Sequence, residues 1–272
     1  MEHDVQTQFV TAGSLLYEVE HRPWPPPDAQ WLLSQSWNDL LMMHFAVDPQ
    51  ALRQLVPPGL TLELYDGVAW LTVMAFSASH ARPSGVPPLP GISFFSQINL
   101  RTYVSAEDKP GVYYLSVDCG NLSAVWFARM FFRLQYWHSS IQVSGATLRP
   151  SKPNDGLIHL RARRQHGPAT AGGPARLEVD YAPVGEVRPA RQHTLDDFLA
   201  ERYCVYSRRG QRYYRIEVHH QPWPLQRAEA AVKQNTLAEP MGLLLSAQPQ
   251  LCHFSRSIKL LTWAPQRIAS LG

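Results

Sequence analysis

The chain has 272 residues, of which 17% are charged and 11% are aromatic, and its formal net charge is +3 with histidine neutral. Its arginines are scattered rather than aligned in a stripe, which argues against nucleic-acid binding. No window approaches eighteen consecutive apolar residues, and the first twenty residues lack a cationic start followed by an apolar run. Neither a membrane span nor a secretory signal is therefore expected.

Three widely spaced cysteines, Cys119, Cys204 and Cys252, occur without any CxxC motif. This pattern indicates neither a disulfide framework nor a cysteine zinc site, and it makes a cytoplasmic location the expectation. Because no linker or internal repeat divides the chain, we expect one domain from about 22 to 264 between two tails, 1–21 and 265–272. The oligomeric state is left open, and a homo-oligomer is compatible with the sequence.

Short helices are predicted where capping residues precede suitable sequence. Asp48 before Pro49, Asn121, and Thr194 followed by Asp197 each mark a helix start. The segment 225–235, LQRAEAAVKQN, has helical composition and is also predicted to be a helix. The other apolar runs are typical of strands, and the 23 prolines favour many turns. The fold class is therefore α+β, mainly antiparallel β, with short helices laid over the strands.

The stretch 94–118 predicts a central hairpin whose first strand alternates between polar and apolar residues. Because successive side chains on a strand point to opposite faces, Gln97, Asn99, Arg101 and Tyr103 share one face. The turn is expected within 105–111, SAEDKPG. Simple alternation in the return strand places Val112, Tyr114, Ser116 and Asp118 on one side.

The polar face of this hairpin suits an enclosed polar cavity or a buried hydrogen-bond network, and alternation cannot separate the two. Arg101 either faces a ligand or pairs with Asp118 or another carboxylate inside the sheet. Arg101 and Arg129 could form a carboxylate clamp, or they could pair with Asp118, Glu201 or Glu217. The candidate pocket residues are Gln97, Asn99, Arg101, Tyr103, Asp118, Arg129, His44 and Tyr203.

Other kinds of site lack their motifs. No histidines show HxxxH or HxH spacing, and the adjacent His219 and His220 would face opposite ways on a strand, so no metal site is expected. GxSxG, SxxK and glycine-rich phosphate loops are absent, so no nucleotide or other cofactor is expected.

Several ordered segments resemble the bacterial YqjF-like family, a domain of unknown function within the acetoacetate decarboxylase-like superfamily. They span about 22 to 263 and are HRPWPPP, WNDLLMMHF, LVPPGLTLELYDGVAW, NLRTYV, KPGVYYLSVD, FLAERYCVY and HHQPWPLQRA. The resemblance implies a closed, cone-like antiparallel β-barrel with outer helices and an internal pocket.

The same resemblance exposes departures from decarboxylase chemistry. Acetoacetate decarboxylases use a lysine that forms a Schiff base, yet the corresponding segment, 128–136, offers Arg129 and Arg133. Arginine stays protonated and forms no Schiff base at neutral pH. The YqjF-like pattern usually holds glutamate at the position of Gln97. Of the four lysines, Lys109, Lys152, Lys233 and Lys259, only Lys259 is a conceivable inward nucleophile.

Two classes of function follow from these observations. The first is a protein that binds a small organic acid or apolar ligand in a barrel pocket without Schiff-base chemistry. The alternative is an enzyme acting on a carbonyl or carboxylate compound, in which arginine stabilises an enolate-like charge and Tyr103, Glu201 or a histidine moves protons.

Overall fold

Strands make up most of the protein, and only a few short helices accompany them. The computed structural model describes residues 12–89, 91–132, 134–145 and 156–269. The helices are α1 (Ala12–Leu15), α2 (Pro49–Leu55), α3 (Leu122–Phe131), α4 (Leu195–Ala200) and the 3-10 turn η1 (Glu239–Met241). The strands are β1 (Leu33–Val47), β2 (Thr61–Leu62), β3 (Ala69–Pro83), β4 (Phe95–Ala106), β5 (Lys109–Cys119), β6 (Tyr136–Gly145), β7 (Ile158–Arg164), β8 (Ala169–Thr170), β9 (Gly173–Pro174), β10 (Arg176–Arg188), β11 (Cys204–Arg209), β12 (Arg212–His219), β13 (Leu225–Asn235), β14 (Leu251–Thr262) and β15 (Gln266–Arg267).

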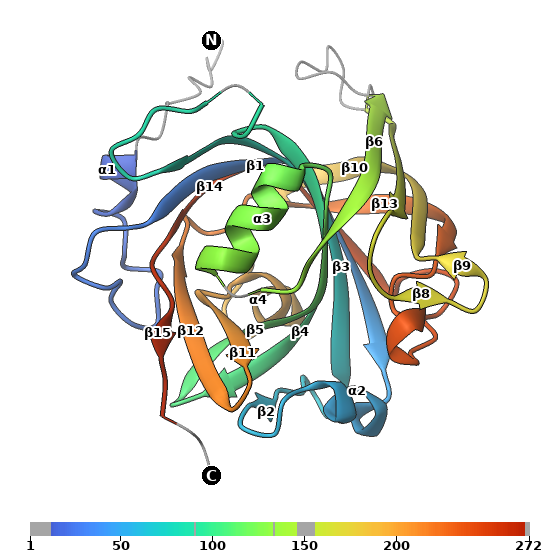
Figure 1. Ribbon diagram of the computed structural model, residues 1–272, viewed down its shortest axis with the longest axis horizontal. Helices are drawn as coiled ribbons and strands as arrows, with labels where there is room; N and C mark the ends of the chain where they lie inside the picture. The colour runs from blue at the N-terminus through green and yellow to red at the C-terminus, as the bar shows by residue number, and fades with distance from the viewer. Residues whose placement is uncertain (1–11, 90, 133, 146–155, 270–272) are drawn as a thin grey trace.

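All of these strands except β8 and β9 belong to one 13-stranded sheet. Its order is β15-β12-β11-β5-β6-β7-β10-β13-β14-β1-β3-β4-β2, and β4 also pairs with β5 and β12 with β14. The pairings of β5 with β6 and with β11 are parallel, and the others are antiparallel as expected. Figure 1 shows that the sheet curves around α4, with α3 lying across the front of the opening.

The predicted central hairpin is formed by β4 and β5, and its strands are longer than the sequence indicated. Ala106 pairs with Lys109, so the turn is reduced to Glu107 and Asp108. Both turn residues have positive φ, 50° and 56°, the conformation that a two-residue hairpin turn of the primed type requires.

The long strands separate two apolar cores because their side chains alternate. On β1, Leu41, Met43 and Phe45 pack into one core together with residues of α2, β7 and β10. Leu40 and Met42 point to the opposite side, where the second core includes Ala200 at the end of α4. The concave face of the sheet is therefore apolar but incompletely filled, and the candidate site lies there.

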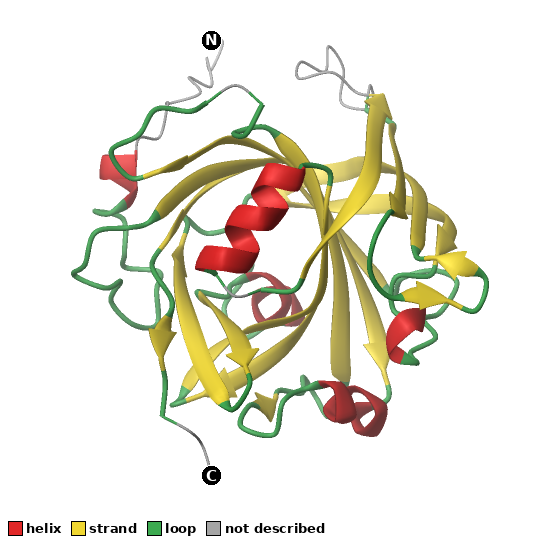
Figure 2. Cartoon of the chain, in the orientation of Figure 1, coloured by secondary structure: helices red, strands yellow, loops and turns green. Residues whose placement is uncertain are grey.

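Capping residues begin the helices where the sequence predicted. The Asp48 side chain accepts from the backbone N–H of Gln50, and the Asn121 side chain accepts from that of Ala124. The Thr194 hydroxyl accepts from the backbone N–H of Asp197 at the start of α4. Figure 2 shows α3 and α4 as two separate helices, with α3 in front and α4 deeper within the curve of the sheet.

The prediction of a helix at 225–235 was wrong, because this segment is strand β13. It pairs with β10 over most of its length, and its residues alternate between partly buried and exposed. Alternate residues Ala228, Ala230 and Val232 pack on the first core. Pairing and burial therefore outweighed the helix propensity of Ala, Glu, Gln and Lys.

The segment before β1 packs across the outer end of β12. Leu15 is buried against Leu261 and Trp263, and its carbonyl lies 2.7 Å from Nε2 of His219. Arg22 donates to Glu217, which also binds Arg215 and Lys109. Within the described residues, no helix has the length and apolar character needed to cross a membrane.

Acid should destabilise this packing through its buried histidines. Burial lowers the pKa of His219 and of His220 to about 4, below the ordinary value of 6.5. Between these values the unfolded chain binds more protons than the folded chain, so stability falls as pH falls. Between about pH 6.5 and pH 4, we expect the melting temperature of His219→Gln to fall less than that of wild type.

The matched control is His166→Gln, because the His166 side chain is exposed. Equal acid sensitivity of wild type and His219→Gln would contradict the assignment of this loss to His219.

Candidate functional site

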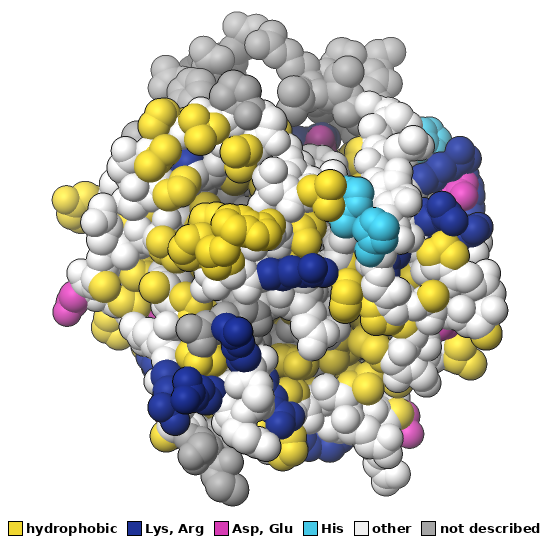
Figure 3. All heavy atoms as spheres, viewed as in Figure 1, with side chains coloured by type: hydrophobic (Ala, Val, Ile, Leu, Met, Phe, Trp, Pro, Cys, Tyr) yellow, Lys and Arg dark blue, Asp and Glu magenta, His cyan; other side chains and the backbone are white. Residues whose placement is uncertain are grey.

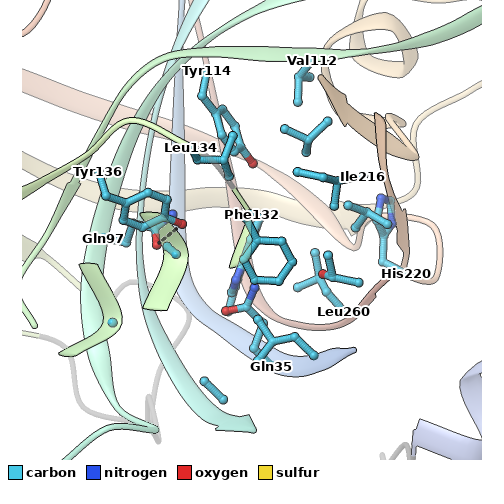
Figure 4. Close-up of a pocket in the computed structure, with 18 of the residues that line it drawn as sticks. Gln35, Gln97, Val112, Tyr114, Phe132, Leu134, Tyr136, Ile216, His220 and Leu260 are labelled. Carbon is cyan, nitrogen blue, oxygen red and sulfur yellow. Dashed lines mark hydrogen bonds between the residues drawn. The ribbon is translucent and has the colours of Figure 1, made fainter. Parts of the chain in front are cut away.

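A partly enclosed cavity lies between the concave face of the sheet, α3 and α4. The volume within it that is open to water-sized molecules is about 140 Å³. In Figure 4 the labelled side chains Phe132, Leu134, Ile216 and Leu260 surround the cavity with apolar surface. None of the described residues that line it is an aspartate, a glutamate or a lysine. This absence of anionic groups decides what the cavity can bind.

Arg101 is the cationic group of this cavity that lacks a carboxylate partner. It lines the cavity from β4 and is only 4% exposed. Its Nη2 donates to the backbone carbonyl of Leu199 at 2.8 Å, and Met42 and Met74 place sulfur atoms 4.0 Å from the guanidinium. Its Nε–H has no hydrogen-bond partner, and among the described residues Arg101 makes no ion pair.

The other arginine that lines the cavity is already neutralised. Arg202 forms an ion pair with Glu63, and its Nε donates to the backbone carbonyl of Phe198 at 2.7 Å. Among the described residues of the lining, Arg101 is therefore the positive charge without a carboxylate partner.

Helix α4 holds Arg101 in place because its last turn carries the carbonyl of Leu199 into the interior. The same carbonyl lies 3.0 Å from the hydroxyl of Tyr103, which stands two residues after Arg101 on β4. One backbone oxygen thus orients Arg101 and Tyr103, two of the four side chains on the predicted polar face.

Further hydrogen-bond donors around the cavity are unused. The indole N–H groups of Trp37 and Trp223, two lining residues, are buried and have no partner. Buried donors are normally satisfied, so each orphan needs an acceptor that the protein itself does not supply. With the Nε–H of Arg101, three buried and unpaired donors thus belong to side chains that line the cavity.

Two tyrosines and a glutamine also contribute to the polar lining. The Tyr136 hydroxyl donates to Oε1 of Gln97 at 3.2 Å, and Figure 4 shows the Tyr114 hydroxyl pointing into the cavity. Tyr114 lies opposite Arg101 in the β4–β5 register. Burial raises the pKa of both tyrosines, so both phenols stay protonated at neutral pH.

A bulge in β5 explains why sequence reasoning undervalued Tyr114 and misplaced Asp118. Leu100 pairs with Ser116 while Arg101 pairs with Tyr114, so Leu115 is an extra residue in β5. An extra residue reverses the alternation beyond it. Tyr114 consequently faces the cavity, and Asp118 faces away from it.

Asp118 pairs with Arg164, so the alternative in which Arg101 pairs with Asp118 is wrong. Nε and Nη2 of Arg164 lie 2.8 and 2.7 Å from the two carboxylate oxygens, in a bidentate arrangement. Ser139 donates a further hydrogen bond to Asp118, and Ser116 accepts one from Arg164. Both charged side chains are almost fully buried. Asp118 is part of this buried ion pair and does not line the cavity.

Arg129 is not brought together with Arg101, so the two arginines form no clamp. Its side chain is exposed, donates to the carbonyl of Tyr136 and stacks over Trp137. The alternatives of pairing with Glu201 or Glu217 fail as well. Glu201 binds Tyr203 and the backbone of Trp223, and Glu217 binds Arg22, Lys109 and Arg215. Arg133 lies outside the described residues.

The outer face of α3 carries apolar side chains as well as Arg129. Leu122, Trp126, Met130 and Phe131 are between 43% and 62% exposed. Figure 3 shows hydrophobic side chains gathered over this helix.

The other candidate residues are buried near the cavity without lining it. Tyr203 donates to Glu201 and stacks on His220. Asn99 is fully buried, and neither of its side-chain polar atoms has a partner. Of the eight candidates, Gln97 and Arg101 line the cavity.

His44 belongs to a buried hydrogen-bonded chain that begins at Tyr103. The Tyr103 and Thr72 hydroxyls are 2.6 Å apart, Thr72 is 2.8 Å from Nδ1 of His44, and Nε2 of His44 is 3.0 Å from Nδ1 of His253. Nε2 of His253 is 3.1 Å from Asp196, a carboxylate near the surface. Burial, with His253 and Arg101 nearby, holds the pKa of His44 well below its usual range.

The lysines that the structure describes are engaged away from the cavity. Lys109 binds Glu217, and Lys233 binds Asp180 and Glu178 on the outer surface. Lys259 lies on β14, and burial lowers its pKa, but it does not line the cavity. Lys152 lies outside the described residues. No described group of three or more His, Cys, Asp or Glu side chains could hold a metal ion.

The Asp118–Arg164 pair should be essential to stability. Arg164→Met leaves a buried carboxylate without its partner, so we expect the free energy of unfolding in urea to fall by about 3–5 kcal/mol.

The matched control removes an arginine that is paired on the surface. Arg161→Met breaks the Arg161–Glu178 pair, whose arginine side chain is 68% exposed, and should cost less than about 1 kcal/mol. Similar losses in the two variants would contradict a structural role for the buried pair.

Solved structures with the same fold include acetoacetate decarboxylase-like enzymes. The enduracididine biosynthesis enzyme MppR, complexed with the condensation product of pyruvate and imidazole 4-carboxaldehyde, superposes with a TM-score of 0.59 at 13% identity and covers 92% of each chain. An acetoacetate decarboxylase-like enzyme from Sphingomonas wittichii RW1 gives 0.58 at 14% identity, covering 92% of this chain and 98% of its own. Acetoacetate decarboxylase from Legionella pneumophila gives 0.56 at 10% identity, covering 94% and 95%. These likenesses establish the fold.

Sequence comparison gives the family. The uncharacterised protein YqjF of Bacillus subtilis (strain 168) is 34% identical over 237 residues, which are 87% of this chain and 93% of YqjF. The model of the DUF2071 family matches residues 34–259. The resemblance inferred from the sequence motifs is thus confirmed: the chain belongs to DUF2071, a family of uncharacterised conserved proteins.

Proposed function

We propose that the protein binds a small organic acid in the cavity, with Arg101 as the counter-ion, and that it forms no Schiff base. The observation that carries this proposal is a buried guanidinium that has an unused N–H and no ion-pair partner among the described residues. A buried charge without a partner costs several kcal/mol, and the carboxylate of a ligand would offset that cost.

The remainder of the lining supports the same conclusion. Unpaired donors on Trp37 and Trp223 and the Tyr114 hydroxyl favour a ligand that accepts hydrogen bonds. Arginine presents two parallel N–H groups to a carboxylate, which makes this anion the best match for Arg101. MppR, a structural neighbour, is complexed with a product formed from pyruvate, a small carboxylate.

In this proposal the sheet closes into the cone-like barrel that the family resemblance implies. The pairings of β4 with β5 and of β12 with β14 join strands that lie far apart in the sheet order. A wall joined in this way would keep water from the Arg101 end and strengthen its attraction for an anion.

The second candidate is an enzyme that acts on a carbonyl or carboxylate compound. The favouring observation is that Tyr114, rather than Tyr103 or Glu201, reaches the cavity beside Arg101. Because burial raises the pKa of Tyr114, this phenol would serve as a proton donor while Arg101 stabilised an enolate-like charge. Binding of an acid is common to both candidates.

Schiff-base chemistry should be undetectable. Treatment with borohydride in the presence of acetoacetate should leave the intact mass unchanged, because the described residues that line the cavity include no lysine. An acetoacetate-dependent adduct on any lysine, Lys259 included, would refute this part of the proposal.

Arg101→Met tests the counter-ion directly. The variant removes an uncompensated charge, so we expect its stability without ligand to change by less than about 1.5 kcal/mol. When the acid concentration is a hundred times Kd, the free energy of unfolding of wild type should rise by about 2.7 kcal/mol. This rise should be absent in the variant. Thermal unfolding with and without a panel of organic acids measures both quantities.

Arg129→Met is the matched control, because Arg129 is exposed on α3 and should leave both quantities unchanged. A large loss of stability in Arg101→Met with an intact response to acids would make Arg101 a structural residue.

A further inference from the structure

We propose that the ligand of this cavity is an amphipathic monocarboxylate, with its carboxylate at Arg101 and an alkyl or aryl body of about six or more carbon atoms within the apolar part of the cavity. This inference rests on the proposed function and names its ligand class. A protein with such a ligand differs from one that binds short keto acids.

The charges of the lining limit the ligand to one negative charge. Arg202 is paired with Glu63, and Nδ1 of the lining residue His220 lies 2.7 Å from the carbonyl of Gln221. Burial lowers the pKa of His220 to about 4, so its imidazole is neutral at pH 7. Among the described residues of the lining, Arg101 alone is then left to balance an anion, and a second carboxylate would be buried without a partner among them.

The size of the cavity argues against a short acid. Acetoacetate has seven non-hydrogen atoms and displaces at most roughly seven water molecules, about one for each atom. The cavity offers about 140 Å³ to water-sized molecules, which is room for roughly ten waters at about 10–15 Å³ each. A short acid at Arg101 would leave part of this space to water.

The walls of that remaining space are apolar. The inner face of α3 supplies Ala124, Phe127 and Ala128, and Phe132 and Leu134 follow it. Opposite them stand side chains from the sheet: Leu33, Val112, Ile216, Val218 and Leu260. Water between such walls makes few hydrogen bonds, whereas an alkyl or aryl body removes apolar surface from water on both sides.

Ala124 and Ala128 set the depth available to the ligand body. They lie one helical turn apart on α3, are buried and line the cavity. A larger side chain at position 128 would occupy the space assigned to the ligand body. Ser123 is exposed, so it offers a matched position on the same helix.

The experiment measures Kd by calorimetry for straight-chain monocarboxylates from acetate to decanoate, for acetoacetate, and for octanol and octanedioate. Each added methylene should lower Kd about fourfold until the cavity is full, because burial of one CH₂ contributes about 0.8 kcal/mol. Octanol and octanedioate should bind at least tenfold more weakly than octanoate. Arg101→Met should abolish binding of every acid.

The Ala128→Leu variant tests where the ligand body lies. It should weaken octanoate and decanoate at least tenfold while leaving butanoate within about twofold, and Ser123→Leu should behave as wild type. Because α3 also exposes apolar side chains, long acids that bound equally to all variants would be adsorbed on the surface, and the inference would be wrong.

The outcomes separate this inference from the function on which it rests. Arg101-dependent binding with a Kd independent of chain length, or tightest for acetoacetate, would overturn the inference and leave the proposed function standing. Absence of Arg101-dependent binding by any acid would overturn both.

Discussion

The arrangement of the site depends on one backbone oxygen, the carbonyl of Leu199. It accepts from Arg101 and lies within hydrogen-bond distance of Tyr103, so a single turn of α4 fixes two side chains of β4. Helix α4 can deliver this oxygen because its last carbonyls have no partner within the helix. A carbonyl satisfies the geometry of a guanidinium without neutralising its charge. Arg101 is consequently held in one orientation and still requires an anion, which is the combination expected of a binding group.

A chain of hydrogen bonds ties this arrangement to the surface. The Tyr103 hydroxyl has one proton and donates it to the Leu199 carbonyl, so it accepts from Thr72, and Thr72 in turn accepts from Nδ1 of His44. The lowered pKa of His44 keeps this imidazole neutral, so its Nε2 accepts from Nδ1 of His253. Nε2 of His253 faces Asp196 and Arg227 near the surface. The carbonyl of Leu199 therefore sets the direction of the hydrogen bonds from Tyr103 to His253.

The bulge at Leu115 places one acid and one phenol of β5, Asp118 and Tyr114, on opposite faces of the sheet. Without it, alternation would place Asp118 on the same side as Tyr114, and the cavity would contain a carboxylate able to neutralise Arg101. With it, Asp118 meets Arg164 in a dry, bidentate pair on the other side of the sheet. A single extra residue thus changes the cavity from a neutral pocket into a cationic one.

The sequence by itself determined the local features of this protein. It predicted the three capped helices, the hairpin of β4 and β5, and the shared face of Gln97, Asn99, Arg101 and Tyr103, because caps and strand alternation depend on neighbouring residues. Its motifs also identified the family. The tertiary structure decided the partners. Asp118 pairs with Arg164, and Arg129 lies on the surface. Tyr114 points into the cavity, and 225–235 forms a strand beside β10. Each of these outcomes depends on register and pairing between segments far apart in the chain, which no local pattern encodes.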